Sequence, residues 1–340
     1  MQVVVLAGGV GSRLRPWTNS VPKPLLPMLD MSLLERVVEG VPSHLVDEVV
    51  VAGGYKVDMI KEYFQNADVE FDVRIVPEDQ PLGTGGALGN CRDVVSGRFA
   101  CFNGDIVSSL QIEPLLELHQ RNGGVGTLAL WEVEDPTRFG IVGLDEESRI
   151  TQFKEKPAPE EAFSNVINAG LYILEPEVFE HIPVGEKFDF SKQLFPHLLK
   201  MGWPMYAQTI DGVWFDVGQP FELIKAQSTL MSRYDELPFS YPTHYAEHDG
   251  VLMAESVRCE GTVNQAVIGP SSVINEGAQV VSSLLMEGCH VGLGSHVVHS
   301  VLGVGVVVPA NCVVEHCVIG DGVVLQANEK YTAEKIEHFP

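Results

Sequence analysis

Hydrophobic residues in the first 230 or so positions follow two alternating patterns. Continuous runs rich in valine predict buried strands, at 2–8, 47–54, 71–78, 98–105 and 126–134. Between them, apolar residues at helical spacing predict helices at 55–66 and 113–124, and a further helix is predicted at 216–237. Strands alternating with helices imply crossover connections. We therefore expect an α/β fold, with a Rossmann-like, mainly parallel sheet flanked by helices and ligands at the carboxyl ends of the strands.

Beyond residue 250, an aliphatic residue recurs every six positions instead. The first phase comprises Val267, Val273, Leu285, Val291 and Val297, and only Gln279 interrupts it. The second phase, which follows a short insertion, comprises Val301, Val307, Val313, Ile319 and Leu325. A six-residue period is typical of a parallel β-helix, and a chance alternation of valine and glycine is the alternative. Three hexapeptides per coil leave room for about three or four coils. The polar stretch at 328–340 is predicted to cap the open end.

The change of pattern predicts the domain organisation. We expect one domain at 1–236, a connector at 237–250 that is rich in Pro, Tyr and His, and the β-helix with its cap at 251–340.

The formal charge of −24 argues against a general nucleic-acid binder and requires any site for anions to concentrate its cations locally. No apolar run reaches the roughly 18 residues of a membrane span, and no signal peptide is expected. None of the six cysteines forms a C-x-x-C pair. These observations predict a cytoplasmic protein with reduced, buried thiols and no membrane or nucleic-acid partner.

The first strand leads into a glycine-rich loop. Gly8, Gly9 and Gly11 allow a tight turn that points backbone N–H groups at a ligand, and Arg13 and Arg15 add positive charge. Polyphosphate suits such a loop best, although a βα turn in any doubly wound fold also favours glycine. No G-K-[ST] follows, so the loop is not a Walker loop, and the acidic strand end of a dinucleotide site is missing.

The stretch LAGGVGSRLRPWT, followed by VPKPLLPM, resembles the signature of the sugar-nucleotide pyrophosphorylases, which are sugar-1-phosphate nucleotidyltransferases. Further segments similar to family motifs follow in order: PLGTGGAL at 81–88, NGD at 103–105, FGIV at 139–142, EKP at 155–157, NAGLYI at 168–173 and WFDVGQP at 214–220. A left-handed hexapeptide β-helix is a common C-terminal appendage in this family. The resemblance therefore covers nearly the whole chain and makes 1–236 the expected catalytic domain.

The resemblance implies a reaction in which a sugar-phosphate oxygen attacks the α-phosphorus of a nucleoside triphosphate and pyrophosphate leaves. It implies catalytic roles for Arg13, Lys23 and Asp105, and Mg²⁺ held by Asp105 and Asp216, whose carboxylate oxygens suit that ion. Each aspartate alone could instead be a helix cap or a turn residue. The implied nucleotide site comprises Leu6, Gly8, Gly9, Gly11, Ser12, Arg13, Gly83, Thr84 and Gly86, and the implied sugar-phosphate site comprises Gly140, Glu155, Lys156 and Asn168.

The base and the sugar that the enzyme uses are predicted from the particular residues of two motifs. INAGLYILEPEVFEHIP and DVGQP look most like the guanylyltransferases that act on mannose 1-phosphate. Thymidylyl or uridylyl transfer onto glucose 1-phosphate is the alternative, because those enzymes share the scaffold.

Two hypotheses from other classes stay open. A non-catalytic regulatory or scaffold relative would have lost Arg13, Lys23 or an acidic ligand, and all are present. A second activity in the β-helix would need a histidine base, for which His290, His296, His299 and His316 are candidates in number only. Because the segment from Val291 to Val314 carries no acidic or basic residue besides histidine, we expect a homo-oligomer formed partly through the β-helix.

Overall fold

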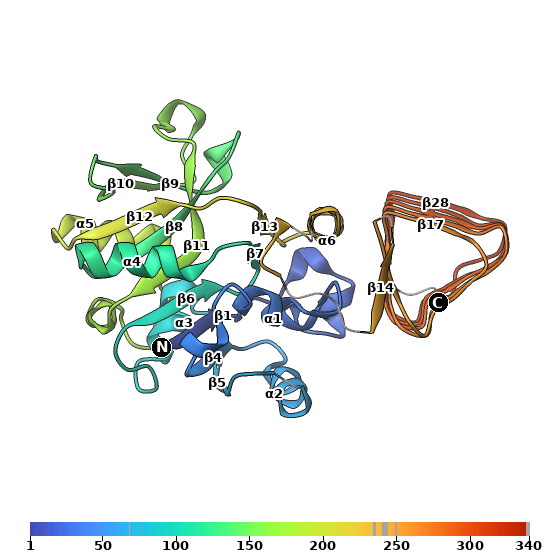
Figure 1. Ribbon diagram of the computed structural model, residues 1–340, viewed down its shortest axis with the longest axis horizontal. Helices are drawn as coiled ribbons and strands as arrows, with labels where there is room; N and C mark the ends of the chain where they lie inside the picture. Colours follow the sequence, from blue (N-terminus) through green and yellow to red (C-terminus); the bar gives the residue numbers. More distant parts are fainter. Residues whose placement is uncertain (68, 234–235, 240–243, 249, 338–340) are drawn as a thin grey trace. The chain divides into compact units, whose positions relative to one another are not determined.

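The computed structural model describes residues 1–67, 69–233, 236–239, 244–248 and 250–337. The chain forms two compact units (Figure 1). Unit 1 comprises Met1–Gly9 and Val37–Trp214, and unit 2 comprises Val10–Arg36 and Phe215–Pro340. The predicted connector at 237–250 lies partly outside the described residues, at 240–243 and 249, and the predicted domain boundaries stay a prediction.

Unit 1 is built on a nine-stranded sheet with the order β10-β9-β11-β6-β1-β4-β5, in which β8 pairs with β11 and β12. The parallel core has β1 at its centre, between β4 and β6, with β5 beside β4. Beyond β6 the sheet becomes antiparallel through β11. The strands are β1 Gln2–Leu6, β4 Glu48–Gly53, β5 Val73–Pro77, β6 Phe99–Asn103, β8 Gly126–Glu132, β9 Gly140–Leu144, β10 Ile150–Glu155, β11 Val166–Leu174 and β12 Met205–Thr209.

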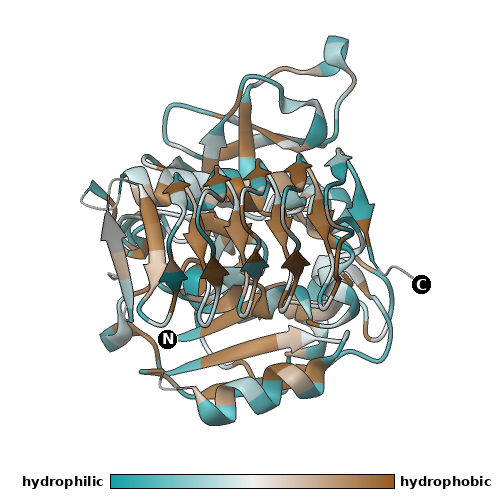
Figure 2. Cartoon of the chain, turned by 90° about the vertical axis from the view of Figure 1, so that its right-hand side faces the viewer, coloured by the Kyte–Doolittle hydropathy of each residue, from teal (hydrophilic) through white to brown (hydrophobic). Residues whose placement is uncertain are grey.

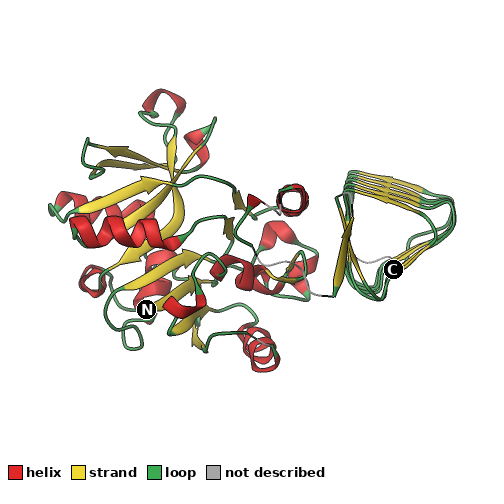
Figure 3. Cartoon of the chain, in the orientation of Figure 1, coloured by secondary structure: helices red, strands yellow, loops and turns green. Residues whose placement is uncertain are grey.

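The helices of unit 1 pack on this sheet (Figure 3). They are α2 Val57–Asn66 on β5, α3 Gly83–Asn90 on β1 and β4, α4 Ile112–Asn122 on β8 and β12, and α5 Phe195–Lys200 on β10. Large side chains such as Phe99, Leu128, Tyr172 and Phe195 fill the core between the layers. The parallel core flanked by helices confirms the predicted fold class.

The predicted helix at 216–237 is wrong at its start. Asp216 ends a short strand, β13 (Trp214–Asp216), and the helix α6 runs over Pro220–Ser232 with Gln219 as its N-cap. Proline is favoured in the first turn of a helix, because its missing N–H has no partner there in any case. The sequence therefore contained the correct start signal at Pro220, four residues after the predicted start.

The C-terminal part of unit 2 is a left-handed parallel β-helix, seen end-on as a triangular coil in Figure 1 and from the side as stacked rungs in Figure 2. One face, which we call the covered sheet, consists of β15 Val251–Ala254, β18 Val267–Ile268, β21 Leu284–Leu285, β24 Val301–Leu302, β27 Val318–Ile319 and β29 Lys335–Ile336, with β14 Tyr245–His248 antiparallel at its edge. The second face is β16 Arg258–Cys259, β19 Val273–Ile274, β22 His290–Val291 and β25 Val307–Val308, and the third is β17 Thr262–Asn264, β20 Gln279–Val281, β23 His296–Val298, β26 Val313–Glu315 and β28 Lys330–Thr332.

The repeat of the coil differs from the predicted one. Residues that occupy the same place in successive coils are 17 positions apart, as in the bond from Ser300 N to Ser283 Oγ, because one side of the triangle is a residue shorter than a hexapeptide. The third face has five strands, so the coil also runs one turn beyond the three or four predicted.

The predicted inward-facing residues are partly wrong. The core of the coil contains Ile268, Ile274 and Val280 rather than Val267, Val273 and the position of Gln279, and Leu302, Val308 and Val314 rather than Val301, Val307 and Val313. Leu285, Val291, Val297, Ile319 and Leu325 are in the core as predicted. Residues of the predicted cap also extend the coil, because Tyr331 and Ile336 lie in strands and in the core. Residues 338–340 of that stretch lie outside the described residues.

The cysteines are free thiols, and all except Cys259 are buried. Burial raises the pKa of Cys91 and of Cys289 to about 12, so neither is a reactive thiolate at neutral pH. Within the described residues, no helix combines the length and the apolar character needed to cross a membrane.

Candidate active site

The carboxyl ends of β1, β4 and β6 lie side by side, because Leu6 is in register with Ala52 on one side and with Asn103 on the other. Gly104 N donates to Leu6 O at 2.9 Å, and a Cβ on Gly104 would lie 2.8 Å from that same oxygen. The turn that presents Asp105 therefore requires glycine in order to pack on the end of β1.

Glu78 extends this strand-end cluster and was not predicted from the sequence. Glu78 directly follows β5, and its backbone N–H donates to Gly53 O at 2.8 Å. Glu78 as a whole is 8% exposed. Its Oε1 accepts from Leu82 N at 2.5 Å, and its Oε2 lies so close to Gly8 that any side chain at Gly8 would collide with it. Burial raises the pKa of this carboxyl group, and the bond from Leu82 opposes that rise. A buried acid is thus held beside the first glycine of the predicted nucleotide loop.

The glycines of the predicted base-recognition segment have a packing role. The N–H groups of Gly85 and Gly86 donate to Phe188 O at 2.9 and 3.0 Å. A Cβ on Gly83, which has a φ of +74°, would lie 2.7 Å from Phe188 O. Thr84 Oγ1 accepts from Phe190 N at 2.9 Å. Contact with residues 186–190 therefore accounts for these glycines, and a role in binding a base stays a prediction.

The predicted sugar-phosphate residues meet at the ends of β9 and β10. Gly140 and Glu155 are paired in register, and a Cβ on Gly140 would lie 2.9 Å from Glu155 Oε2. Burial raises the pKa of Glu155, and neighbouring Lys156 opposes this rise. Lys156 itself has a φ of +46°, and its side chain is 61% exposed, with Nζ 3.9 Å from Glu155 Oε1. The arrangement combines a shielded carboxylate with an accessible ammonium group.

Asn168 joins this group through Ser191. Asn168 Nδ2 lies 2.9 Å from Tyr172 Oη and 3.4 Å from Ser191 Oγ, and the Ser191 hydroxyl also hydrogen-bonds Glu155. The irregular stretch of β11 at Gly170, where φ is +79°, allows this geometry, since Gly170 N donates to Asn168 Oδ1. The structure thus brings all four predicted sugar-phosphate residues together, and it adds Ser191, for which the sequence carried no signal.

Unit 2 holds the predicted residues Gly11, Ser12, Arg13, Lys23 and Asp216, whereas Gly9 is the last residue of the first segment of unit 1. Gly11 adopts a left-handed φ of +67° and precedes the short 3-10 helix Ser12–Leu14, so that Ser12 and Arg13 are exposed. A Cβ on Gly11 would lie 2.9 Å from Thr18 Cγ2 and 3.2 Å from Lys23 Cβ, which places Lys23 directly under the loop.

Gly218 lies between two further predicted groups of unit 2. Its Cβ position would be 2.9 Å from Arg13 Nη2 and 3.1 Å from Asp216 Oδ1. The guanidinium of Arg13 and the carboxylate of Asp216 are therefore near neighbours.

The donor groups of the two predicted metal ligands suit Mg²⁺. Asp105 belongs to unit 1 and Asp216 to unit 2, and no cluster of three or more His, Cys, Asp or Glu side chains suited to a metal occurs among the described residues. Mg²⁺ is usually held by one or two carboxylates together with substrate phosphates, so single aspartates are an adequate donor set. Asn103 Oδ1, two residues before Asp105, is buried without a hydrogen-bond partner in the described part of the chain, as expected where a ligand completes the site.

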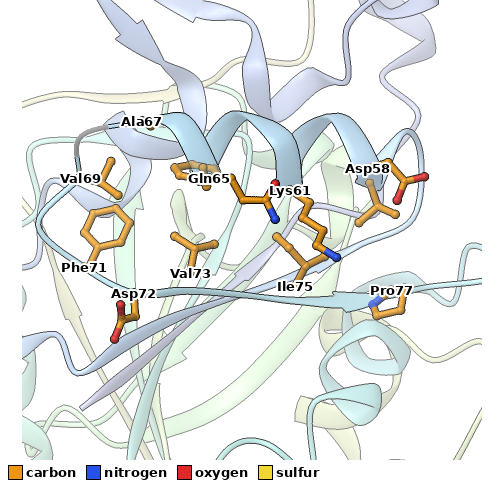
Figure 4. Close-up of a pocket in the computed structure, with 12 residues that line it drawn as sticks. Asp58, Lys61, Gln65, Ala67, Val69, Phe71, Asp72, Val73, Ile75 and Pro77 are labelled. Atoms are coloured by element: carbon orange, nitrogen blue, oxygen red, sulfur yellow. The ribbon is translucent and has the colours of Figure 1, made fainter.

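A cavity of about 540 Å³ lies elsewhere in unit 1, between α2 and β5 (Figure 4). Phe64, Phe71 and Ile75 line it with Lys61 and Asp72. Its described lining contains none of the predicted site residues, so it does not belong to the candidate site.

The β-helix histidines give the acyltransferase alternative no further support. His299 and His316 are exposed, at the same place in successive coils, and their rings stack with centroids 5.0 Å apart. One ring nitrogen of His290, also exposed, lies 2.7 Å from Asn275 Nδ2.

Residues 2–233 match the family described as "Nucleotidyl transferase", and residues 251–335 match "GlmU-like, C-terminal hexapeptide". The chain belongs to the nucleotidyl transferase family and is a sugar-1-phosphate nucleotidyltransferase.

Curated relatives include enzymes for two different bases. A UTP–glucose-1-phosphate uridylyltransferase of Synechocystis is 30% identical over 330 residues, covering 86% of this chain and 85% of the relative. A mannose-1-phosphate guanylyltransferase of Mycobacterium tuberculosis is 31% identical over 300 residues, covering 86% and 82%. Among solved structures, HddC from Yersinia pseudotuberculosis complexed with GMP-PN is 28% identical, with a TM-score of 0.55 over 66% of this chain and 97% of that one.

Proposed function

We propose that this enzyme transfers a guanylyl group from GTP to mannose 1-phosphate or a related manno-configured sugar 1-phosphate. A phosphate oxygen of the sugar 1-phosphate forms a bond to the α-phosphorus of GTP, while the bond from the α-phosphorus to the bridging oxygen breaks and pyrophosphate leaves. The products are a GDP-sugar and pyrophosphate. The observation that carries the choice of base is the buried carboxylate of Glu78 beside Gly8.

A carboxylate accepts hydrogen bonds through both oxygens and donates none while it is ionised. Guanine presents two adjacent donors, N1–H and N2–H, on its pairing edge. Uracil and thymine present one N–H between two carbonyl acceptors, which a carboxylate would repel. Glu78 Oε1 already accepts from Leu82 N, and each oxygen has lone pairs for a second bond. Uridylyl or thymidylyl transfer onto glucose 1-phosphate is the alternative, and the uridylyltransferase among the relatives supports this alternative.

The cations have separate roles in this proposal. Arg13 neutralises the departing pyrophosphate, Lys23 lies near the reacting phosphates, and Lys156 binds the phosphate of the sugar. The family uses a divalent metal ion, and we propose Mg²⁺ held by Asp105 and Asp216. When bound, the ion would offset part of the negative charge through which the two anionic substrates repel each other.

The sugar hydroxyls would be bound by the network of Gly140, Glu155, Asn168 and Ser191. Shielded polar groups of this kind discriminate between epimers, because a hydroxyl in the wrong position leaves one of them without a partner. The mannose-1-phosphate guanylyltransferases among the relatives support a manno-configured sugar.

We further propose a cytoplasmic homo-oligomer that associates partly through the β-helix. Exposed aliphatic side chains support this, since Leu293, Val304 and Val324 are 56%, 43% and 58% exposed. Light scattering of the full chain tests it, and a monomer at all concentrations would rule it out.

The choice of base is tested by Glu78→Gln, with Glu48→Gln as the control because Glu48 is also a partly shielded acid, paired with Arg74 at 2.7 Å. Gln offers one donor and one acceptor, which suits uracil better than guanine. We expect kcat/KM for GTP to fall about a hundredfold or more and the ratio of UTP to GTP use to rise. Glu48→Gln should leave both values unchanged. An unaltered GTP preference in Glu78→Gln would refute the assignment.

A further inference from the structure

The segment with the proposed phosphate-binding cations is structurally part of the β-helix unit. Residues 10–36, which we call the loop segment, carry Arg13 and Lys23 and cluster with 215–340 in unit 2. Within the loop segment, Trp17 is 1% exposed, and its Nε1 donates to Ile319 O in β27 at 2.9 Å. A buried indole thus connects two positions 302 residues apart.

Contacts on either side of Trp17 fix the same attachment. A Cβ on Gly320 would lie 3.0 Å from Pro16 Cγ. The end of β27 must therefore lack a side chain at this position for the loop segment to approach it. Ser20 Oγ donates to Asp321 Oδ2, and Asp321 Oδ1 accepts from Val304 N at 2.9 Å, which ties the contact to the preceding coil.

The covered sheet is apolar on both of its surfaces. Besides the inward-facing residues, Val267, Leu284, Val301 and Val318 are 3%, 2%, 0% and 1% exposed. The loop segment covers part of this outer surface, since its Leu25, Leu26 and Leu29 line a cavity of about 240 Å³ together with Val267 and Leu284. The remaining two faces lack such a cover at their histidines, because His290 and His296 are exposed.

The attachment continues from Trp17 to the cations. Thr18 Oγ1 donates to Gly11 O at 2.9 Å, and its methyl group lies against Gly11. Gly11 in turn opens the 3-10 helix that carries Arg13, and it lies against Lys23. Lys335 Nζ of β29 also donates to Arg13 O at 3.3 Å. Every step from β27 to the two cations is therefore a direct contact.

We propose that the β-helix supports the triphosphate site by holding the loop segment in place. Trp17 is the positioning residue that fixes Arg13 and Lys23 on the covered sheet. This inference rests on the proposed function of those two cations. Misplacing a charged group by about 1 Å can lower a rate by about a hundredfold, so a rigid support for the loop has a direct catalytic value. The coil thereby acts on nucleotide binding without touching the nucleotide.

Trp17→Phe in the full chain tests the proposal, because Phe keeps an aromatic ring but cannot donate to Ile319 O. We expect KM for GTP to rise about tenfold and kcat to fall, while KM for mannose 1-phosphate stays within about twofold of the wild type. Hydrogen–deuterium exchange of residues 10–20 should become about tenfold faster, with the second and third faces unchanged.

The matched control is Ser295→Ala. Ser295 is fully buried between the second and third faces, where its Oγ donates to Pro309 O and accepts from Cys312 N. This variant loosens the coil at the corner opposite the covered sheet. We expect its kcat and KM values, and the hydrogen–deuterium exchange of residues 10–20, to equal those of the wild type. If both variants lose activity only in proportion to thermal stability, the positioning role is wrong. If Trp17→Phe fails to fold, Ser20→Ala replaces it, and an unchanged KM for GTP and unchanged exchange there would also overturn the proposal.

Arg13→Ala separates this inference from the proposed function. Full activity in Arg13→Ala would refute the proposed role of Arg13 without affecting the exchange measurement. Normal exchange in Trp17→Phe would refute the attachment even if Arg13 proves essential.

Discussion

Lys156 and Glu155 are adjacent, yet one side chain is 61% exposed and the other 18%, with Nζ and Oε1 3.9 Å apart. The ammonium group points outward from a shielded carboxylate. We expect Lys156→Ala to raise KM for sugar 1-phosphate about tenfold with a smaller effect on kcat, because the contact is already made in the ground state. Steady-state kinetics with Lys154→Ala as the control, since Lys154 is paired with exposed Glu161, measure this. An unchanged KM for the sugar would contradict the role.

Arg13→Ala should show the opposite division. Charge on the departing pyrophosphate grows in the transition state, so loss of Arg13 lowers kcat more than it raises either KM. We expect a loss of about a hundredfold in kcat. A change confined to KM for sugar 1-phosphate would show that the two phosphate sites are assigned the wrong way round.

Two glycines of the same loop differ in what surrounds them. A Cβ on Gly9 would meet nothing within 4 Å, whereas one on Gly11 would meet Thr18 and Lys23 in a strained left-handed backbone. Gly9→Ala should therefore keep its stability and lose nucleotide affinity, because only a bound phosphate would meet the new methyl group. Gly11→Ala should lose about 1–3 kcal/mol of stability as well. Thermal unfolding and nucleotide titration of both variants test this, and normal affinity in Gly9→Ala would argue against phosphate at that backbone.

The proposed metal ligands are tested by Asp105→Asn and Asp216→Asn. Each change keeps the size of the side chain and removes a charge, so folding should survive while turnover falls about a hundredfold or more. A raised Mg²⁺ requirement should accompany the loss. Near-normal rates for both variants at ordinary Mg²⁺ concentration would show that these aspartates are turn residues.

Glu78 should also leave a signature in the pH dependence of stability. Its pKa is raised in the folded chain by burial, so the unfolded chain ionises first as pH rises. The folded state is therefore favoured below the ordinary pKa of 4.5 and loses that advantage as pH rises through the raised value. We expect Glu78→Gln to be more stable than the wild type at pH 7, with the difference shrinking toward pH 4. Urea unfolding at both pH values measures it, and a constant difference would contradict the burial argument.

The sequence predicted five strands of unit 1, β1, β4, β5, β6 and β8, and the helices α2 and α4, because each carries its own local pattern. The strands β9 to β12 and the helices α3 and α5 were not predicted as elements. The sequence predicted the wrong phase in the coil for a physical reason. Val267 and Ile268 are both buried, as are Val301 and Leu302, since the loop segment covers the outer surface of the same sheet. When both surfaces are apolar, alternation no longer shows which side faces inward.

The candidate site was predictable wherever a residue lies in a motif, as for Glu155 and Asn168. Ser191 was not, because only the tertiary fold brings it to Asn168. Glu78 was the last residue of a predicted strand, but nothing local indicates that it is buried against Gly8. The glycines at 83 and 86 were predicted for a ligand, and their surroundings show a packing requirement first.

The most direct test of the proposed reaction is pyrophosphate release measured for five nucleoside triphosphates, each combined with several sugar 1-phosphates. We predict that GTP with mannose 1-phosphate, or a related manno-configured sugar, gives the highest kcat/KM, ahead of UTP or dTTP with glucose 1-phosphate. Preference for UTP or dTTP would contradict the role of Glu78. Absence of pyrophosphate release from every pair would contradict the proposed reaction itself.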